Sequence, residues 1–211
     1  MEKFMLGKKA GMTQLFNEKG IAIPVTVLEC GPLSVVQKKT AENDGYSAVK
    51  VGYGDIAEKK LTKPAKGQFK KHEISPKKYL REFRTDADFT VGQEINVSDM
   101  FAVGDRVDIS GISKGKGFAG VTKRYNQKTG PLTHGSMYHR RVGSMGANTD
   151  PARVFPGKKL PGHMGAVNVT VQNLEVVIVD KDRNILVLKG AVPGPKGGGI
   201  LEIKKTVKSG K

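Results

Sequence analysis

Short runs of β-branched and other apolar residues, separated by turn signals, recur along most of the chain. The runs that we expect to be strands are Ile21–Leu28, Leu33–Lys38, Tyr46–Tyr53, Phe89–Val97, Val103–Ile109, Ala166–Gln172, Leu174–Val179, Ile185–Leu188 and Ile200–Val207. In the Ala166–Gln172 run, valines alternate with polar residues, which predicts a half-buried strand. Many short strands with almost no helical pattern predict a mainly β domain, a barrel or a sandwich. Closure into a barrel is favoured because it leaves no exposed strand edge.

One segment breaks this pattern. Residues Glu58–Arg84 are rich in lysine, and Ser75–Pro76 is typical of a helix start, so we predict a short helix over Pro76–Arg84. Leu80 and Phe83 are three residues apart and would dock this helix on the barrel. We therefore expect a small inserted α+β subdomain. Its lysines form either a solvated face or an auxiliary anion-binding surface.

The stretch Gly111–Gly165, the basic stretch, has no apolar periodicity and so no face to bury. It carries ten Lys or Arg residues against one acid, Asp150, and eleven of the chain's 27 glycines. Its cations are interleaved with four aromatic residues: Phe118, Tyr125, Tyr138 and Phe155. A loop this long inside a domain is usually functional or disordered, and aromatic residues are rare in disordered segments. We expect a loop that becomes ordered against dense negative charge.

Charge and composition narrow the class of partner. The formal net charge is +16 and the pI is near 9.9, which favours a polyanion, because cations near phosphates release condensed counterions. No Lys/Arg-rich amphipathic helix is visible that would hold the chain on a membrane. The single cysteine, Cys30, excludes an internal disulfide. No apolar run has the length of a membrane span or a secretory signal, so we expect a cytoplasmic protein that binds nucleic acid and no membrane.

Gly115, Gly117 and Gly120 spell a GxGxxG motif after a predicted strand. A dinucleotide site would need a helix, a second strand and an acid about twenty residues further on, and the sequence offers none of these in order. The glycines instead suit close approach to a phosphate backbone, flanked by Lys114 and Lys116. We expect no cofactor and no small-molecule substrate.

His134, His139 and His163 raise the possibility of a metal site or a general base. The neighbouring Arg140 and Arg141 would repel a metal cation, and no acid is evident that would orient a histidine. We therefore expect no metal site and no catalytic residue. Histidines among arginines and tyrosines more often contact phosphates or stack on bases.

The chain lacks the recognition helix or zinc finger of a duplex DNA reader, so irregular RNA is the better target. The predicted division is a barrel of residues 1–58, 88–120 and 164–211, an inserted subdomain of residues 59–87, and an extended loop of residues 121–163. Two extended arms of about twenty residues, at ~3.3 Å per residue, would reach about 65 Å. The predicted RNA-binding residues are Lys114, Lys116, Lys123, Arg124, Lys128, His134, His139, Arg140, Arg141, Ser144, Asn148, Arg153, Lys158, Lys159 and His163.

Two long segments, Gly111–Asn126 and His134–Gly165, resemble the bacterial form of the ribosomal protein L3 family. The opening Leu6–Phe16 and the closing Val179–Gly198 resemble the same family, so the likeness covers nearly the whole chain. It implies a β-barrel of the translation-protein type that binds 23S ribosomal RNA near its 3′ end and nucleates assembly of the large subunit, next to other ribosomal proteins. The long loop would extend toward the peptidyl transferase centre, and the protein would not be an enzyme.

The resemblance also places individual residues. Ser144 and Asn148 match tip residues that are linked in the family to antibiotics acting at the peptidyl transferase centre. Some relatives carry a methylated glutamine where this chain has Thr149, so that modification is not expected here. A barrel enzyme or flavin-binding module that uses the glycine-rich loop, and a DNA-binding regulator, stay open as alternatives.

Overall fold

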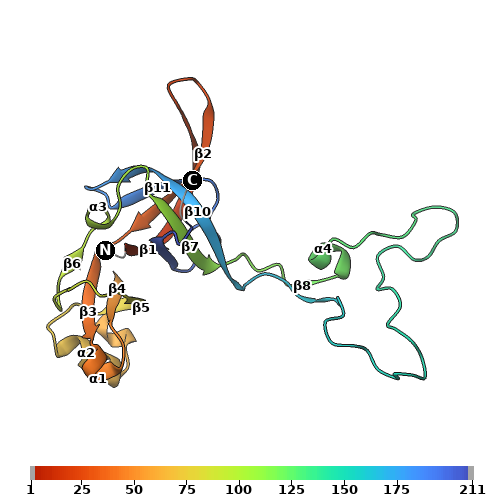
Figure 1. Cartoon of the computed structure of the whole chain (residues 1–211), viewed down its shortest axis with the longest axis horizontal. Helices are drawn as coiled ribbons and strands as arrows, with labels where there is room; N and C mark the ends of the chain where they lie inside the picture. The colour runs from red at the N-terminus through yellow and green to blue at the C-terminus, as the bar shows by residue number, and fades with distance from the viewer. Residues whose placement is uncertain (1–2, 209–211) are drawn as a thin grey trace. The chain divides into compact units, whose positions relative to one another are not determined.

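The structure, a computed structural model, describes residues 3–208. Within these residues, six antiparallel strands close into a barrel (Figure 1). In order around the barrel they are β1 (Phe4–Phe16), β12 (Leu201–Lys205), β7 (Arg106–Ile112), β10 (Asn168–Asp180), β11 (Ile185–Lys189) and β2 (Ala22–Cys30). The ring closes where β2, from Ala22 to Cys30, pairs with β1. The predicted mainly β fold with a closed barrel is confirmed.

A second sheet of four strands, in the order β5, β4, β3 and β6, lies beside the barrel (Figure 1). Its strands are β5 (Lys77–Arg84), β4 (Ala48–Asp55), β3 (Leu33–Lys39) and β6 (Glu94–Ile95). The predicted strands Leu33–Lys38 and Tyr46–Tyr53 therefore exist, but they belong to this sheet and not to the barrel. The change of sheet follows Gly31, whose φ of 77° turns the chain in a conformation that favours glycine.

The helix predicted over Pro76–Arg84 is wrong, because β5 occupies that segment and pairs with β4 from Lys77 to Arg84. Its buried residues follow a strand period, since Lys77 and Phe83 are buried on the same face. A side chain at Gly52 would lie 2.6 Å from Cγ of Lys77, so this glycine makes room for the lysine stem.

Short helices connect the strands. They are α1 (Ala41–Asp44), the 3-10 helix η1 (Glu58–Lys60), α2 (Lys63–Lys70) and α3 (Val97–Met100). The strand predicted over Phe89–Val97 is reduced to β6, because Asn96 and Asp99 form a capping box that starts α3. The inserted segment between β4 and β5 does contain a helix, α2, whose Phe69 is buried.

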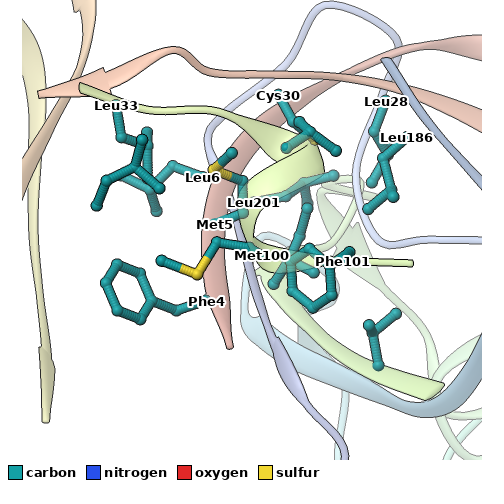
Figure 2. Close-up of a cluster of buried hydrophobic side chains, with 14 of the residues drawn as sticks. Phe4, Met5, Leu6, Leu28, Cys30, Leu33, Met100, Phe101, Leu186 and Leu201 are labelled. Carbon is teal, nitrogen blue, oxygen red and sulfur yellow. The ribbon is translucent and has the colours of Figure 1, made fainter. Parts of the chain in front are cut away.

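One hydrophobic core serves both sheets. Phe4, Met5 and Leu6 are consecutive in β1 and all buried, because one face of this strand looks into the barrel and the other meets the second sheet (Figure 2). On the second sheet, Phe83 stacks on Phe4 with ring centroids 4.6 Å apart. Burial also raises the pKa of the Cys30 thiol, which keeps this cysteine a neutral core residue.

The first half of β10 differs from its prediction. Val169 is 39% exposed, and the expected half-buried valine face is not formed. The reason is that this half pairs only with β7, whereas β11 joins β10 from Val176 onward. One extra residue at a register shift between Val171 and Leu174 separates the two halves.

The chain divides into two compact units. Unit 1 comprises Met1–Ile112 and Asn168–Lys211 and holds the barrel and the second sheet. Unit 2 is Ser113–Val167 and contains almost the whole basic stretch. Its elements are β8 (Phe118–Ala119), α4 (Val121–Tyr125) and β9 (Gly162–His163).

Asp105 connects the start of the chain to the turn before β7. Its carboxylate accepts hydrogen bonds from the Ala102 amide, at 2.9 Å, and from the Lys3 ammonium. Partial burial raises the pKa of Asp105, but the hydrogen bonds from Ala102 and Lys3 outweigh it, so the net pKa is below the ordinary value. The charged carboxylate therefore stabilises the folded state.

We expect Asp105→Asn to lower the free energy of unfolding by about 1 kcal/mol at neutral pH. Because the folded pKa is depressed, this contribution is present above the unfolded value of about 4 and is lost as the pH falls through the folded pKa. Urea unfolding at pH 7 and pH 3 measures the difference. Asp88→Asn is the control, because Asp88 is 84% exposed and pairs only with Lys38. An equal loss for Asp105→Asn at both pH values would contradict the assignment.

Candidate nucleic-acid interface

A small hydrogen-bonded base holds the two ends of unit 2 together. β8 and β9 pair antiparallel, with Phe118 opposite His163. The pairing continues through two backbone bonds, from the Lys116 amide to the Met164 carbonyl at 2.8 Å and from the Met164 amide to the Gly117 carbonyl at 2.9 Å. Only two hydrophobic side chains of this unit, Ala119 and Val121, are buried, so hydrogen bonding more than apolar burial defines it.

Close packing within this base requires glycine. A Cβ at Gly165, whose φ is +74°, would lie 2.1 Å from the carbonyl oxygen of Lys114. A Cβ at Gly162 would lie 2.6 Å from Nη1 of Arg124. The sequence pattern singles out Gly115 and Gly117 for close approach to a ligand and misses these two contacts. The sequence signal that could have indicated these contacts is the pair of closely spaced glycines, Gly162 and Gly165, at the end of the basic stretch.

The GxGxxG segment has a geometry of its own. Gly117 adopts a φ of +65°, and Gly120 is the N-cap of α4, which has only five residues. No strand follows this helix before β9 at Gly162. A dinucleotide-binding unit needs a longer helix and a second parallel strand, so the segment does not form one.

Arg124 has a structural contact that its predicted role did not include. Its Nη1 donates a hydrogen bond to the Leu160 carbonyl at 2.9 Å, across 36 residues of chain. The guanidinium also lies 5.1 Å from the centre of the Tyr125 ring, and the Lys159 ammonium lies 5.9 Å from the same ring. Tyr125 thus carries two cations beside a partly exposed ring.

Residues 126–161, the irregular loop, contain no helix or strand. Two of their backbone amides donate to backbone carbonyls within the loop: Gly130 to His139, at 2.8 Å, and Ser136 to Thr133, at 3.4 Å. His139 is half-buried, and its Nδ1 lies 3.0 Å from the Pro131 carbonyl. This local turn is the best-bonded part of the loop, and most other backbone groups have no protein partner there.

The predicted tip, Gly143–Asp150, has few contacts. The Lys158 ammonium donates to the Ser144 carbonyl at 2.6 Å, and the Gly146 amide donates to the Ser144 hydroxyl at 3.2 Å. Asn148 is exposed. Nearby, the Arg153 guanidinium lies 5.2 Å from the centre of the Phe155 ring, and both side chains are open to solvent. The pair offers a positive charge and an aromatic face together.

All fifteen predicted binding residues lie in unit 2. Thirteen are exposed, and Arg124 and His139 are half-buried. Within residues 3–208, every ion pair that forms joins residues of unit 1, so the ten cations of unit 2 have no carboxylate partner. Exposed apolar side chains accompany them, including Leu132 and Met137, which the sequence analysis missed because they follow no period. The unit presents uncompensated positive charge beside apolar and aromatic surface.

The part of the chain that the structure describes offers neither of two other kinds of site. No three His, Cys, Asp or Glu side chains among those residues gather closely enough to hold a metal ion. No helix there is both long enough and apolar enough to cross a membrane.

The fold and this surface define a class: a basic β-barrel protein that carries a glycine-rich, cationic loop unit. The model of the family described as "Ribosomal protein L3" matches residues 82–184. The chain is also 65% identical to "Large ribosomal subunit protein uL3" of Acetivibrio thermocellus, over the full length of both chains. The chain therefore belongs to the ribosomal protein L3 family, and the resemblance noted in the sequence is confirmed.

The base of unit 2 can be tested through Gly165. We expect Gly165→Ala to force Lys114 away and to weaken the bonds at Lys116 and Met164, because the new Cβ cannot share space with the Lys114 carbonyl. Amide hydrogen exchange at these two residues should become at least severalfold faster. Gly120→Ala is the matched control, since nothing lies within 4 Å of its added Cβ and its φ is −70°. Unchanged exchange in Gly165→Ala would refute the close contact.

Proposed function

We propose that this chain is a structural constituent of the bacterial large ribosomal subunit, in the cytoplasm, and that unit 2 binds 23S ribosomal RNA. Membership of the ribosomal protein L3 family and the name of its relative support the first part. One observation carries the second part: ten exposed or half-buried cations with no carboxylate partner among the residues that the structure describes. Polyphosphate supplies the missing counter-charge.

The fifteen predicted residues would make different kinds of contact, according to their side-chain chemistry. Exposed Arg and Lys side chains, such as Arg140, Arg141 and Lys116, neutralise phosphates, and arginine does so with two parallel hydrogen bonds. Tyr125 and Phe155, each with a cation beside the ring, provide surfaces on which unpaired bases stack. Arg124 and Lys158 act differently, because they also hold the loop through the Leu160 and Ser144 carbonyls.

The family resemblance supplies the finer part of the proposal. The barrel binds the RNA near its 3′ end, beside other large-subunit proteins, and helps nucleate subunit assembly. Residues 121–163 extend toward the peptidyl transferase centre, with Ser144 and Asn148 near the tip. The inserted segment of residues 59–87 is basic and belongs to unit 1, because its strand β5 pairs with β4. The protein performs no chemistry in this proposal, because its role is to fix the fold of the RNA.

Replacing Arg140, Arg141 and Arg153 with alanine tests phosphate binding. If unit 2 neutralises about eight phosphates, the log-log dependence of affinity on salt has a slope of about −6 to −7, and the triple variant should lose about 2 to 3 of it. Filter binding to a 23S RNA transcript over a range of salt concentrations gives both slopes. The control, Lys19, Lys181 and Lys196 replaced with alanine, removes the same charge from exposed positions of unit 1. Unchanged affinity and normal subunit assembly in the arginine variant would defeat the proposal.

The irregular loop should be protected from hydrogen exchange only in the presence of RNA. In the free chain its amides should exchange at nearly unprotected rates, apart from Gly130, because few have a partner. With the 23S transcript bound, exchange should slow by tenfold or more across residues 126–161. Barrel amides in β7 serve as the internal control. Strong protection of the loop in the free chain would show that it is ordered without RNA.

A further inference from the structure

A second basic surface lies in unit 1, where the start of β1, the end of β5, and the end of β12 with the two residues after it surround a groove of about 730 Å³. Sites that bind ligands are commonly of this size. Four cations line the groove against one acid, Glu82. None of these residues is among the fifteen predicted RNA-binding residues, although Arg84 ends the segment for which an auxiliary anion-binding surface was left open.

The charges around the groove do not cancel. The Glu82 carboxylate is already paired, at 3.1 Å, with Lys39, which lies outside the groove. Lys3 is paired with Asp105. Arg84 and Lys205 form no ion pair with any described residue, and both are exposed. Lys205 is balanced only in part, by the longer-range attraction of the Asp105 carboxylate, so the groove keeps an excess of positive charge.

Lys204 adds a third, weakly compensated charge. Its ammonium lies 3.9 Å from Glu202, and the other oxygen of that carboxylate is bound by Arg81 at 2.9 Å. The Lys204 ammonium also lies 5.3 Å from the centre of the Phe83 ring, at the floor of the groove. Lys204 and Lys205 both line the groove, so an approaching anion would interact with both charges.

The wall that carries these lysines is fixed by hydrogen bonds. The Lys205 amide donates to the Lys3 carbonyl at 3.0 Å, and the Thr206 amide donates to the Arg106 carbonyl at 3.1 Å. The Val207 amide donates to the Asp108 carboxylate at 3.4 Å. The chain leaving β12 is thus held against β1 and β7, which reduces the conformational entropy that is lost on binding.

The floor of the groove indicates which part of a polyanion it would take. Phe4 and Phe83 stack on each other and are each only 2% exposed, so neither offers a free face to a base. The accessible groups are the charged ends of the lysines and Arg84, together with the exposed side chain of Val207. Contacts of this kind read phosphate and sugar and carry no base sequence.

We propose that this groove binds the phosphodiester backbone of an RNA segment, as a second contact separate from unit 2. Arg84 and Lys205 supply the principal phosphate contacts, and Lys204 supports them. The proposal rests on the proposed function only for the identity of the polyanion as ribosomal RNA. It assigns the RNA contact of the protein body to one groove and to named cations, whose positions are set by sheet pairing.

The test compares full-length variants in binding to a 23S transcript. Replacing Arg84 and Lys205 with alanine should lower the magnitude of the salt slope by about 1.4 to 1.8, because each phosphate that is no longer neutralised removes about 0.7 to 0.9. Replacing Lys181 and Lys196 with alanine, which removes the same charge from exposed sites, should leave the slope unchanged. Circular dichroism and urea unfolding verify that each variant is folded.

A measurement on the unaltered chain complements the variants. Bound RNA should slow modification of Lys205 by an amine-reactive reagent at least fivefold, while Lys181 reacts at its free rate. The groove proposal is overturned if the Arg84 and Lys205 variant keeps the parental salt slope, or if RNA does not protect Lys205. Either result leaves RNA binding by unit 2 intact, because the variant of Arg140, Arg141 and Arg153 tests that binding separately. Protection of Lys205 by polyglutamate and not by RNA would identify an acidic protein segment as the occupant and also overturn it.

Discussion

Uncompensated positive charge is the constraint on which the arrangement of this protein depends. Ten cations and one carboxylate within 55 residues cannot neutralise one another, and the unit that holds them buries only two hydrophobic side chains. Neither ion pairing nor apolar burial within the unit offsets the entropy of ordering so long a loop. In the proposed function, RNA phosphates supply the counter-charge and accept hydrogen bonds from backbone amides.

Unit 1, in contrast, is stabilised by its own contacts. Its ion pairs are internal, its core is continuous from the barrel to the second sheet, and Phe4 contributes to that core from a strand that both layers share. Such a body tolerates the repulsion of an attached basic unit because its own stability comes from apolar burial, which ionic screening does not weaken. The glycines at the base of unit 2 then let the two ends of the loop run close together.

The sequence was sufficient for features that are encoded locally. The lysines, arginines and glycines of the basic stretch lie in one unit because they are contiguous in the chain. Runs rich in β-branched residues form strands because that composition suits a pleated sheet. It was insufficient where distant segments decide. Pro76–Arg84 carries helix signals, yet pairing with β4 makes it a strand, and only that pairing explains the burial of Lys77. The bond from Arg124 to Leu160 spans 36 residues and has no local signature.

The order of the barrel strands has a consequence for synthesis. β12, the last strand, fits between β1 and β7, with Ile203 opposite both Met5 and Ile109. A chain made from its amino end therefore exposes the whole basic unit before β12 is available to close the barrel. Because Phe4 pairs with Lys204, about 200 residues further along the chain, this pairing is intrinsically slow. A nascent chain can thus contact a polyanion through unit 2 while the barrel of unit 1 is still an open sheet.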